Sequence, residues 1–223
     1  MIRLCIFDLD GTLADTLGSI AGFANQALRR CGWGEIPLEE YRYLVGNGAD
    51  QLMRGMLKRA AGSFSEQDVA RLRAVYDALY EADPLRDVTP YPGMLQTLQQ
   101  LKRQGCGLAV LSNKPDNVTQ AVVGGMFPPG LFARCWGQRE GVPRKPSPEG
   151  ALRIAQELAV SPAECLYIGD TCVDMQTGNS AGMRTVGVLW GFRDRKELEE
   201  NHAWRIAAAP EEILRFAAGE EEE

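Results

Sequence analysis

CIFDLDGTLADT, residues 5–16, joins an apolar run directly to two aspartates. The run at residues 4–7 has the length of a buried strand, and Asp8 and Asp10 follow it with one apolar residue between them. Because alternate residues of an extended chain lie on the same face, the two carboxylates start out close together and repel each other. A metal ion, a shared proton or exposure to water at a loop could offset that repulsion.

The composition is typical of an ordinary soluble globular protein. The 223 residues are enough for a full core, either as one domain or as one domain with an insert. The 24 Lys and Arg residues against 30 Asp and Glu residues leave a formal net charge of −6, which argues against nucleic acid or an anionic membrane as a partner. Part of the acidic excess is the terminal run at residues 220–223, which we expect to be solvated and disordered.

The cysteine pattern and the chain start bear on the cellular compartment. Six cysteines are scattered without a CxxC pair, and several lie in apolar segments, where a free thiol packs as a small hydrophobic group. The N-terminal segment is strand-like and soon charged, unlike a signal peptide, and no apolar run reaches the length of a membrane span. We therefore expect a protein of the reducing cytoplasm.

Short apolar runs alternate with helical patterns over much of the chain. Four runs have the length of a buried strand: residues 3–7, 107–111, 165–168 and 185–189. Their continuous apolar character fits burial on both faces of a parallel sheet. Residues 94–104 and 148–158, between these runs, carry apolar residues at helical spacing. This alternation predicts an α/β fold with a doubly wound parallel sheet, a Rossmann-like core.

Residues 15–87 interrupt the alternation, because they show helical periodicity and no strand-like run. Apolar residues from Leu17 to Cys31 follow the spacing of one helix face, and Gly32 marks its stop. Two or three further helices are expected before the prolines at positions 84, 90 and 92. We predict a core made of residues 1–14 and 88–223, with residues 15–87 as a helical insert.

Polar side chains appear where three of the predicted strands end. Asp8 ends the first, Ser112 and Asn113 end the second, and Asp170 follows the third. Ligands of open parallel sheets bind at the carboxyl ends of the strands, near the point where the strand order reverses. We therefore expect Asp8 and Asp170 in one crevice, although they are far apart in sequence.

Asp10 and Asp174 bring two further carboxylates to the same predicted crevice. Oxygen ligands of this kind suit Mg²⁺, which keeps part of its water shell for a phosphate group to displace. The sequence therefore predicts a magnesium site, and a bound Mg²⁺ would offset the repulsion between Asp8 and Asp10.

Four segments, in this order, resemble the motifs of the haloacid dehalogenase-like superfamily. They are DLDGTL at residues 8–13, LSN at 111–113, RKPSP at 144–148 and GDTCVD at 169–174. One DxD alone would be weak evidence, but four motifs at strand ends, spread over nearly the whole chain, are specific. The helical insert resembles the cap domain of this family. Within it, the most similar group is the phosphoglycolate phosphatases, through VGNGAD at 45–50, LSNKPD at 111–116 and VGVLWGFR at 186–193.

The resemblance implies a catalytic role for each core motif. Asp8 would be the nucleophile that accepts the phosphoryl group as a phosphoaspartate. Asp10 would protonate the leaving oxygen and then act as the base for water. Ser112 and Asn113 would bind the phosphoryl oxygens, and Lys145 would add positive charge.

The resemblance also implies a set of metal ligands. Asp8 and Asp170 would bind Mg²⁺ directly, and Asp10 would contribute its backbone carbonyl rather than its side chain. Asp174 would bind a metal-bound water or orient Lys145.

Contacts with the substrate are implied for both parts of the chain. Thr12 belongs to the first core motif. In the insert, the turn at residues 45–50 would face the active site through Asn47 and Gly48, with Arg54 about one helical turn further on. A small anionic leaving group would need such a cation or backbone donors from the cap.

Simpler interpretations stay open for several of these residues. A DxD at a strand end can be a turn, and Ser112 with Asn113 can cap a helix. The glycines at positions 46 and 48 can belong to an ordinary turn. Lys114 and Lys145 are each of a type that is usually a solvated surface charge, and we favour Lys145 only because its Pro-flanked segment matches a motif.

Asp10 distinguishes among the activities of the superfamily. Dehalogenases lack an acid at this position because they have no leaving oxygen to protonate, so Asp10 argues for phosphoryl chemistry. Sugar phosphomutases usually carry Val where this chain has Thr12. The sequence thus predicts a magnesium-dependent phosphatase for a small phosphorylated metabolite, with 2-phosphoglycolate as the leading candidate.

Three alternatives stay beside this prediction. An inorganic pyrophosphatase and a sugar-phosphate phosphatase or phosphomutase would use the same core motifs. A binding module that has kept the fold would be expected to lose Asp8, Asp10 or Lys145, and all three are present. The oligomeric state, monomer or dimer, is left open by the sequence.

Overall fold

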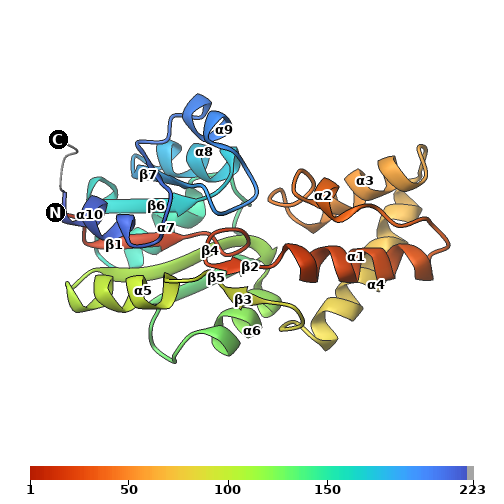
Figure 1. Cartoon of the computed structure of the whole chain (residues 1–223), viewed down its shortest axis with the longest axis horizontal. Helices are drawn as coiled ribbons and strands as arrows, with labels where there is room; N and C mark the ends of the chain where they lie inside the picture. Colours follow the sequence, from red (N-terminus) through yellow and green to blue (C-terminus); the bar gives the residue numbers. More distant parts are fainter. Residues whose placement is uncertain (220–223) are drawn as a thin grey trace.

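The first apolar run forms β1 (Leu4–Phe7), which lies in the middle of a parallel sheet (Figure 1). The computed structural model describes residues 1–219, and the acidic run at 220–223 lies outside them. Within the described residues the sheet has six strands in the order β5–β4–β1–β6–β7–β8. The other strands are β4 (Gly107–Pro115), β5 (Arg134–Gln138), β6 (Cys165–Gly169), β7 (Arg184–Val188) and β8 (Arg205–Ala207).

Helices cover both faces of this sheet. On one face lie α5 (Met94–Arg103), α6 (Asp116–Met126) and α10 (Glu212–Ala218), and on the other α7 (Glu149–Glu157) and α8 (Cys172–Ser180). Along β1, Cys5 and Phe7 belong to the first apolar cluster, whereas Leu4 and Ile6 belong to the second. The apolar run is continuous because both of its faces are buried. The predicted doubly wound α/β fold is confirmed.

The helical insert connects to the sheet through two short strands. Within residues 17–82 the structure contains helices and no strand: α1 (Leu17–Arg30), α2 (Leu38–Tyr41), α3 (Ala49–Ala60) and α4 (Glu66–Ala82). On either side, β2 (Ala14–Asp15) pairs antiparallel with β3 (Thr89–Pro90), so the two connections run side by side. In Figure 1 these helices lie to the right, beyond the carboxyl ends of β1 and β4. The division into a core and a separate cap domain stays a prediction.

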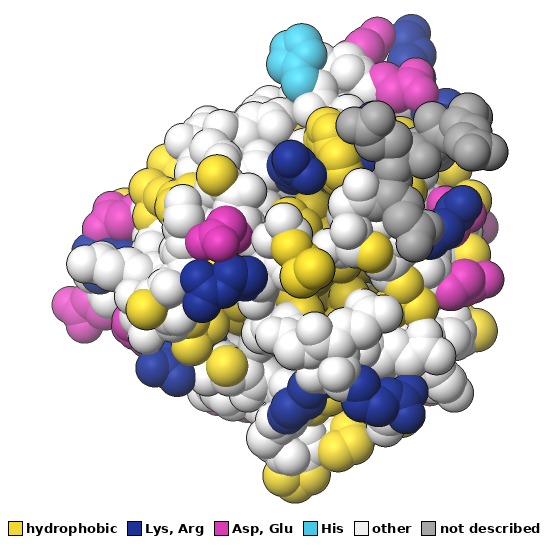
Figure 2. Space-filling model, turned by 90° about the vertical axis from the view of Figure 1, so that its left-hand side faces the viewer, with side chains coloured by type: hydrophobic (Ala, Val, Ile, Leu, Met, Phe, Trp, Pro, Cys, Tyr) yellow, Lys and Arg dark blue, Asp and Glu magenta, His cyan; other side chains and the backbone are white. Residues whose placement is uncertain are grey.

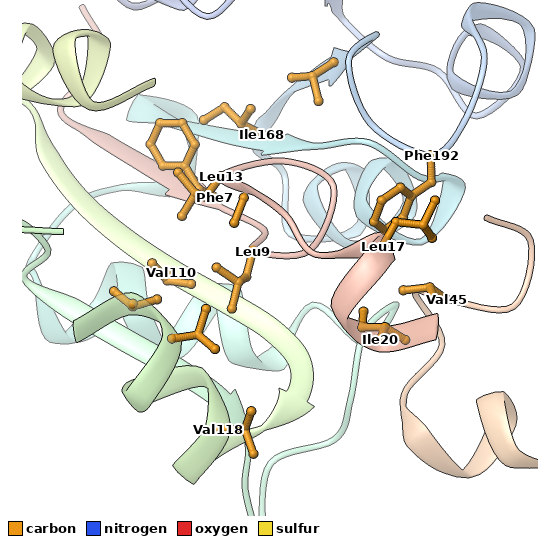
Figure 3. Packing of buried hydrophobic residues seen from close by; sticks show 14 of the residues in the cluster. Phe7, Leu9, Leu13, Leu17, Ile20, Val45, Val110, Val118, Ile168 and Phe192 are labelled. Atoms are coloured by element: carbon orange, nitrogen blue, oxygen red, sulfur yellow. The ribbon is translucent and has the colours of Figure 1, made fainter. Parts of the chain in front are cut away.

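The apolar core runs from the sheet into the insert without a break. One cluster includes Phe7 of β1, Val110 of β4, and Leu17 and Ile20 of α1. Figure 3 shows Leu17 and Ile20 next to Val45, with Leu9 of the loop after β1 between them and the side chains of the sheet. The beginning of the insert is therefore packed directly against the sheet.

The face opposite the insert carries the N-terminus and α10, the last helix of the described residues (Figure 1). Figure 2 shows that apolar side chains on this face lie between scattered basic and acidic ones. Two short helical segments complete the chain, η1 (Pro162–Glu164) and α9 (Arg195–Glu200). Among the helices of residues 1–219, none combines the length and the apolar character that crossing a lipid bilayer requires.

Candidate active site

The carboxyl ends of three neighbouring strands form the centre of the site. β1 pairs with β4 on one side and with β6 on the other. Asp8 directly follows β1 and donates its N–H to the carbonyl of Ile168 in β6 at 2.9 Å. Ser112 lies in β4, and Asp170 directly follows β6. The strand order therefore brings these three residues together at the carboxyl-terminal end of the sheet.

Three buried carboxylates meet at this end of the sheet. One oxygen from each of Asp8, Asp170 and Asp174 can be chosen so that all three lie within 4.8 Å of one another. Burial raises the pKa of Asp8 to about 7, although Lys145 acts in the opposite direction. Burial, and after it the charges of Asp174 and Asp8, raises the pKa of Asp170 well above its usual value. Grouped oxygens that repel one another in this way fit a hard divalent cation such as Mg²⁺.

The Asp170 carboxylate is held by the loops that follow β1 and β7. Its Oδ2 accepts a hydrogen bond from the Phe192 N–H at 2.8 Å, and its Oδ1 accepts one from the Thr12 hydroxyl at 3.3 Å. A Cβ on Gly11, whose φ is +84°, would lie 2.3 Å from Asp170 Oδ2. A Cβ on Gly191 would lie 2.3 Å from Asp170 Cβ. Both glycines are therefore required by the close approach of backbone to this carboxylate.

Lys145 places one buried positive charge between two of the carboxylates. Its ammonium lies 2.9 Å from Asp8 Oδ1 and 2.7 Å from Asp174 Oδ1. Thr171 fixes the other oxygen of Asp174 by donating from its N–H at 3.1 Å and its hydroxyl at 2.7 Å, which forms a capping box at α8. Burial acts to lower the pKa of Lys145, but Asp174 and Asp8 outweigh it and the pKa is raised. Lys145 thus stays a cation, and Asp174 is placed to orient it.

Asn113 connects the site to the insert. Its Nδ2 donates to the carbonyls of Gly46 at 3.0 Å and Lys145 at 3.1 Å, and its Oδ1 accepts from the Lys145 N–H at 2.9 Å. Both N–H groups of the amide are therefore engaged. Asn113 therefore holds two loops in place through its side chain, and its predicted role in binding a phosphoryl oxygen stays a prediction.

The structure adds Lys114, which sequence reasoning treated as a surface charge. Its Nζ lies 2.9 and 3.2 Å from the two carboxylate oxygens of Asp10 and 4.4 Å from the centre of the Tyr80 ring. Only 4% of its side chain is exposed. Burial acts to lower the pKa of Lys114, but Asp10 outweighs it and the pKa is raised. The surface interpretation is wrong for this lysine.

A strand longer than expected explains the burial of Lys114. We expected the second apolar run to end at Ser112, whereas β4 continues to Pro115. β4 is irregular between Leu111 and Pro115, and Ser112, Asn113 and Lys114 all line the cavity at its carboxyl end. The position of Lys114 directly after two expected site residues was the available signal. Ser112 caps no helix, since α6 begins after Pro115, and its hydroxyl accepts from the Lys114 N–H at 3.2 Å.

Asp8 and Asp10 line a cavity of about 50 Å³ between the sheet and the insert. Most of its insert side is apolar or aromatic. Figure 3 shows Ile20 and Val45 next to each other on this side. The residues that line the cavity from the insert are Ile20, Val45, Gly46, Gly48, Ala49, Leu52, Tyr76, Asp77 and Tyr80. The reacting carboxylates therefore face a small, largely apolar chamber.

The four residues expected to contact the substrate lie in different surroundings. Of these four, Gly48 lines the cavity. Thr12 is fully buried behind Asp170, which it orients. Asn47 is exposed, and Arg54 forms two hydrogen bonds of 2.6 Å with Glu66. Neither Asn47 nor Arg54 lines the cavity. The substrate contacts expected of Thr12, Asn47 and Arg54 stay predictions.

The helical geometry of α3 explains the position of Arg54. Ala49 and Leu52, three residues apart, share the face that lines the cavity. Arg54 follows Leu52 by two residues, which turns its side chain to another side of the helix. Two arginines of the core hold the turn before α3. Arg144 donates to the Asn47 carbonyl at 3.3 Å, and Arg193 donates to the Val45 carbonyl at 3.2 Å. Two hydrogen bonds therefore connect the turn at residues 45–50 to the core.

Comparisons with known proteins agree with this geometry. Residues 5–188 match the model of the family described as haloacid dehalogenase-like hydrolase. The phosphoglycolate phosphatase of Pseudomonas putida is 32% identical over 203 residues, which cover 88% of this chain and 73% of that protein. The phosphoglycolate phosphatase of Rhodobacter capsulatus is 35% identical over 196 residues, 86% of this chain and 87% of that protein.

A solved structure supports the same relationship. The crystal structure of a predicted phosphoglycolate phosphatase from Haemophilus somnus superimposes with a TM-score of 0.90 at 26% identity. The superposition covers 96% of this chain and 97% of the other. The family model matches most of the chain, and both the fold and the carboxylates at the strand ends agree with it. The chain belongs to the haloacid dehalogenase-like hydrolases.

Proposed function

We propose that this protein is a magnesium-dependent phosphatase that hydrolyses a small phosphomonoester, with 2-phosphoglycolate as the leading substrate, through a phosphoaspartate on Asp8. The observation that carries the proposal is the buried group of Asp8, Asp170 and Asp174 beside Lys145, at the edge of a small cavity. The relatives named phosphoglycolate phosphatase support the choice of substrate.

Asp8 is the residue we assign as nucleophile. Mg²⁺, held by Asp8, Asp170 and the backbone carbonyl of Asp10, would neutralise part of the phosphoryl charge that otherwise repels an attacking carboxylate. Lys145, 2.9 Å from Asp8 Oδ1, holds this carboxylate in place and adds a second positive charge. The bond from Asp8 to phosphorus forms while the bond from phosphorus to the leaving oxygen breaks.

Asp10 is the residue we assign as general acid and base. It lies two residues after Asp8 and lines the same cavity, where a leaving oxygen would emerge. Protonated Asp10 gives its proton to that oxygen and then takes one from the water that hydrolyses the phosphoaspartate. Lys114 holds the Asp10 carboxylate through contacts of 2.9 and 3.2 Å.

The size and lining of the cavity favour a small leaving group over a sugar. We propose that residues 15–87 act as a cap that encloses this leaving group and excludes water. For the location, we propose the reducing cytoplasm, which the six free cysteines support.

Removing divalent cations should abolish phosphate release. After exhaustive treatment with EDTA, hydrolysis of 2-phosphoglycolate should fall to background, and added Mg²⁺ should restore it, because the phosphoryl charge is then screened again. Phosphate release would be measured over a panel of phosphomonoesters, pyrophosphate and nucleotides. Full activity in EDTA would contradict the metal dependence, and a preference for pyrophosphate would favour that alternative.

Asp10→Asn should slow hydrolysis according to the leaving group. Loss of a general acid costs roughly 10²–10⁴-fold, and less for a good leaving group that needs no proton. We expect a large fall in kcat/KM for 2-phosphoglycolate and a smaller one for p-nitrophenyl phosphate. Asp83→Asn, at an exposed aspartate after α4, is the matched control. Equal losses for both substrates would rule out the acid role.

A further inference from the structure

The charges that line the cavity are unequally distributed. Asp8, Asp10 and Asp77 line it, and Lys114 is its one cation among the described residues. Asp77 is already balanced by Arg73, whose Nε lies 2.6 Å from Asp77 Oδ2. Lys114 is therefore the cationic group within reach of a molecule that occupies the chamber.

Lys114 has a hydrogen-bond donor to spare. An ammonium carries three N–H groups, and the two oxygens of Asp10 occupy at most two of them. Tyr80, whose ring lies 4.4 Å from Nζ, also lines the cavity, and the two side chains interact. Lys114 and Tyr80 thus lie together where the leaving group would lie.

We propose that Lys114 is the residue that selects the substrate, by binding a carboxylate on the leaving group next to the carbon that bears the ester oxygen. Nζ lies 2.9 Å from Asp10 Oδ1, so the ester oxygen at Asp10 and an acceptor at Lys114 can be only a few bonds apart. Phosphorylated 2-hydroxy acids have this spacing. The inference rests on the proposed function. It assigns selection of the substrate to a residue of β4, whereas the sequence predicted a substrate contact for Arg54 of the insert.

The test compares two substrates that differ in one charge. 2-Phosphoglycolate and 2-hydroxyethyl phosphate have the same length, but the second ends in a neutral hydroxyl. For the unmodified protein we expect kcat/KM to favour 2-phosphoglycolate by roughly 10–10²-fold, as for the loss of one hydrogen bond to a charged group. Lys114→Met should bring this ratio to within a few-fold of one, mainly through a loss for 2-phosphoglycolate, and Lys114→Arg should keep part of the preference.

The controls separate selection from other effects. Lys58→Met removes an exposed lysine of α3 and should leave the ratio unchanged. A ratio that stays the same in Lys114→Met, whatever the overall loss, would mean that Lys114 only positions Asp10 and would overturn the inference. If Lys114→Met does not fold, inhibition of the unmodified protein by glycolate and by ethylene glycol decides: no stronger inhibition by glycolate overturns it.

Failure of the inference is distinguishable from failure of the proposed function. Hydrolysis of both esters at equal rates by the unmodified protein would still support the phosphatase activity but would overturn the role of Lys114. Absence of hydrolysis of every phosphate ester, with Mg²⁺ present, would instead overturn the proposed function.

Discussion

Asp8→Asn is expected to lower kcat/KM for 2-phosphoglycolate by about 10⁴-fold or more, as losses of a catalytic nucleophile commonly do. The amide has nearly the shape of the carboxylate, so it should keep its place beside Lys145 and Asp174. However, it is a poor nucleophile and cannot form the acyl phosphate. Phosphate release under saturating Mg²⁺ measures the loss, and thermal unfolding checks that the variant is folded.

A mimic of the phosphoaspartate provides an independent check of the same role. Beryllium fluoride with Mg²⁺ should inhibit the protein as a mimic of the phosphoaspartate, and the Asp8→Asn variant should not bind it. Turnover of Asp8→Asn within tenfold of the unmodified protein would mean that water attacks the substrate directly.

Among the proposed variants, Lys145→Met is expected to cause the largest decrease in the free energy of unfolding. The ammonium is 3% exposed and contacts Asp8 at 2.9 Å and Asp174 at 2.7 Å. Removing one partner of a buried ion pair costs about 3–5 kcal/mol in free energy of unfolding, because the charges that stay behind lose their compensation. Chemical denaturation in EDTA would measure this loss. Added Mg²⁺ should restore part of it, since a bound cation compensates the same carboxylates.

The loss in Lys145→Met should grow with pH. Burial raises the pKa of Asp8 to about 7, so below that value the proton removes one of the charges that Lys145 balances. A carboxyl group whose pKa is raised in the folded state lowers the free energy of unfolding as the pH rises towards that pKa. Without Lys145 the pKa of Asp8 rises further, so this loss continues to a higher pH. The deficit should therefore be larger at pH 8 than at pH 6.

An exposed lysine serves as the control for Lys145→Met. Lys196 lies 3.9 Å from Glu200, and both side chains are mostly exposed, so Lys196→Met should change the stability little. A Lys145→Met variant as stable as this control, in EDTA and at pH 8, would show that the carboxylates need no compensating cation.

The sheet illustrates which strands can be predicted from sequence. The buried strands β1, β4, β6 and β7 coincide with the four apolar runs, because a strand covered on both faces must be apolar throughout. The edge strands β5 and β8 were not predicted. β5 reads RCWGQ and is partly exposed, so that no continuous apolar run marks it. Burial on both faces, rather than strand structure as such, is what the sequence pattern reports.

The core of the site could also be predicted from the sequence. Asp8, Ser112 and Asp170 stand at strand ends, and a parallel sheet brings the carboxyl ends of its strands to one edge. Local pattern and topology therefore suffice to bring together residues that are far apart in the chain. The same reasoning, with β4 extended by three residues, would have included Lys114.

The sequence by itself thus determined the α/β fold, the helical nature of the insert and the carboxylates at the strand ends. Only the tertiary structure decided which side chains surround the leaving group: Lys114 and Tyr80 line the cavity, whereas Arg54 pairs with Glu66 outside it. The physical reason is that helical periodicity defines the apolar face of a helix but not the part of that face that meets the sheet. That choice depends on how α1, α3 and α4 pack against the core, through many contacts that no local stretch of sequence contains.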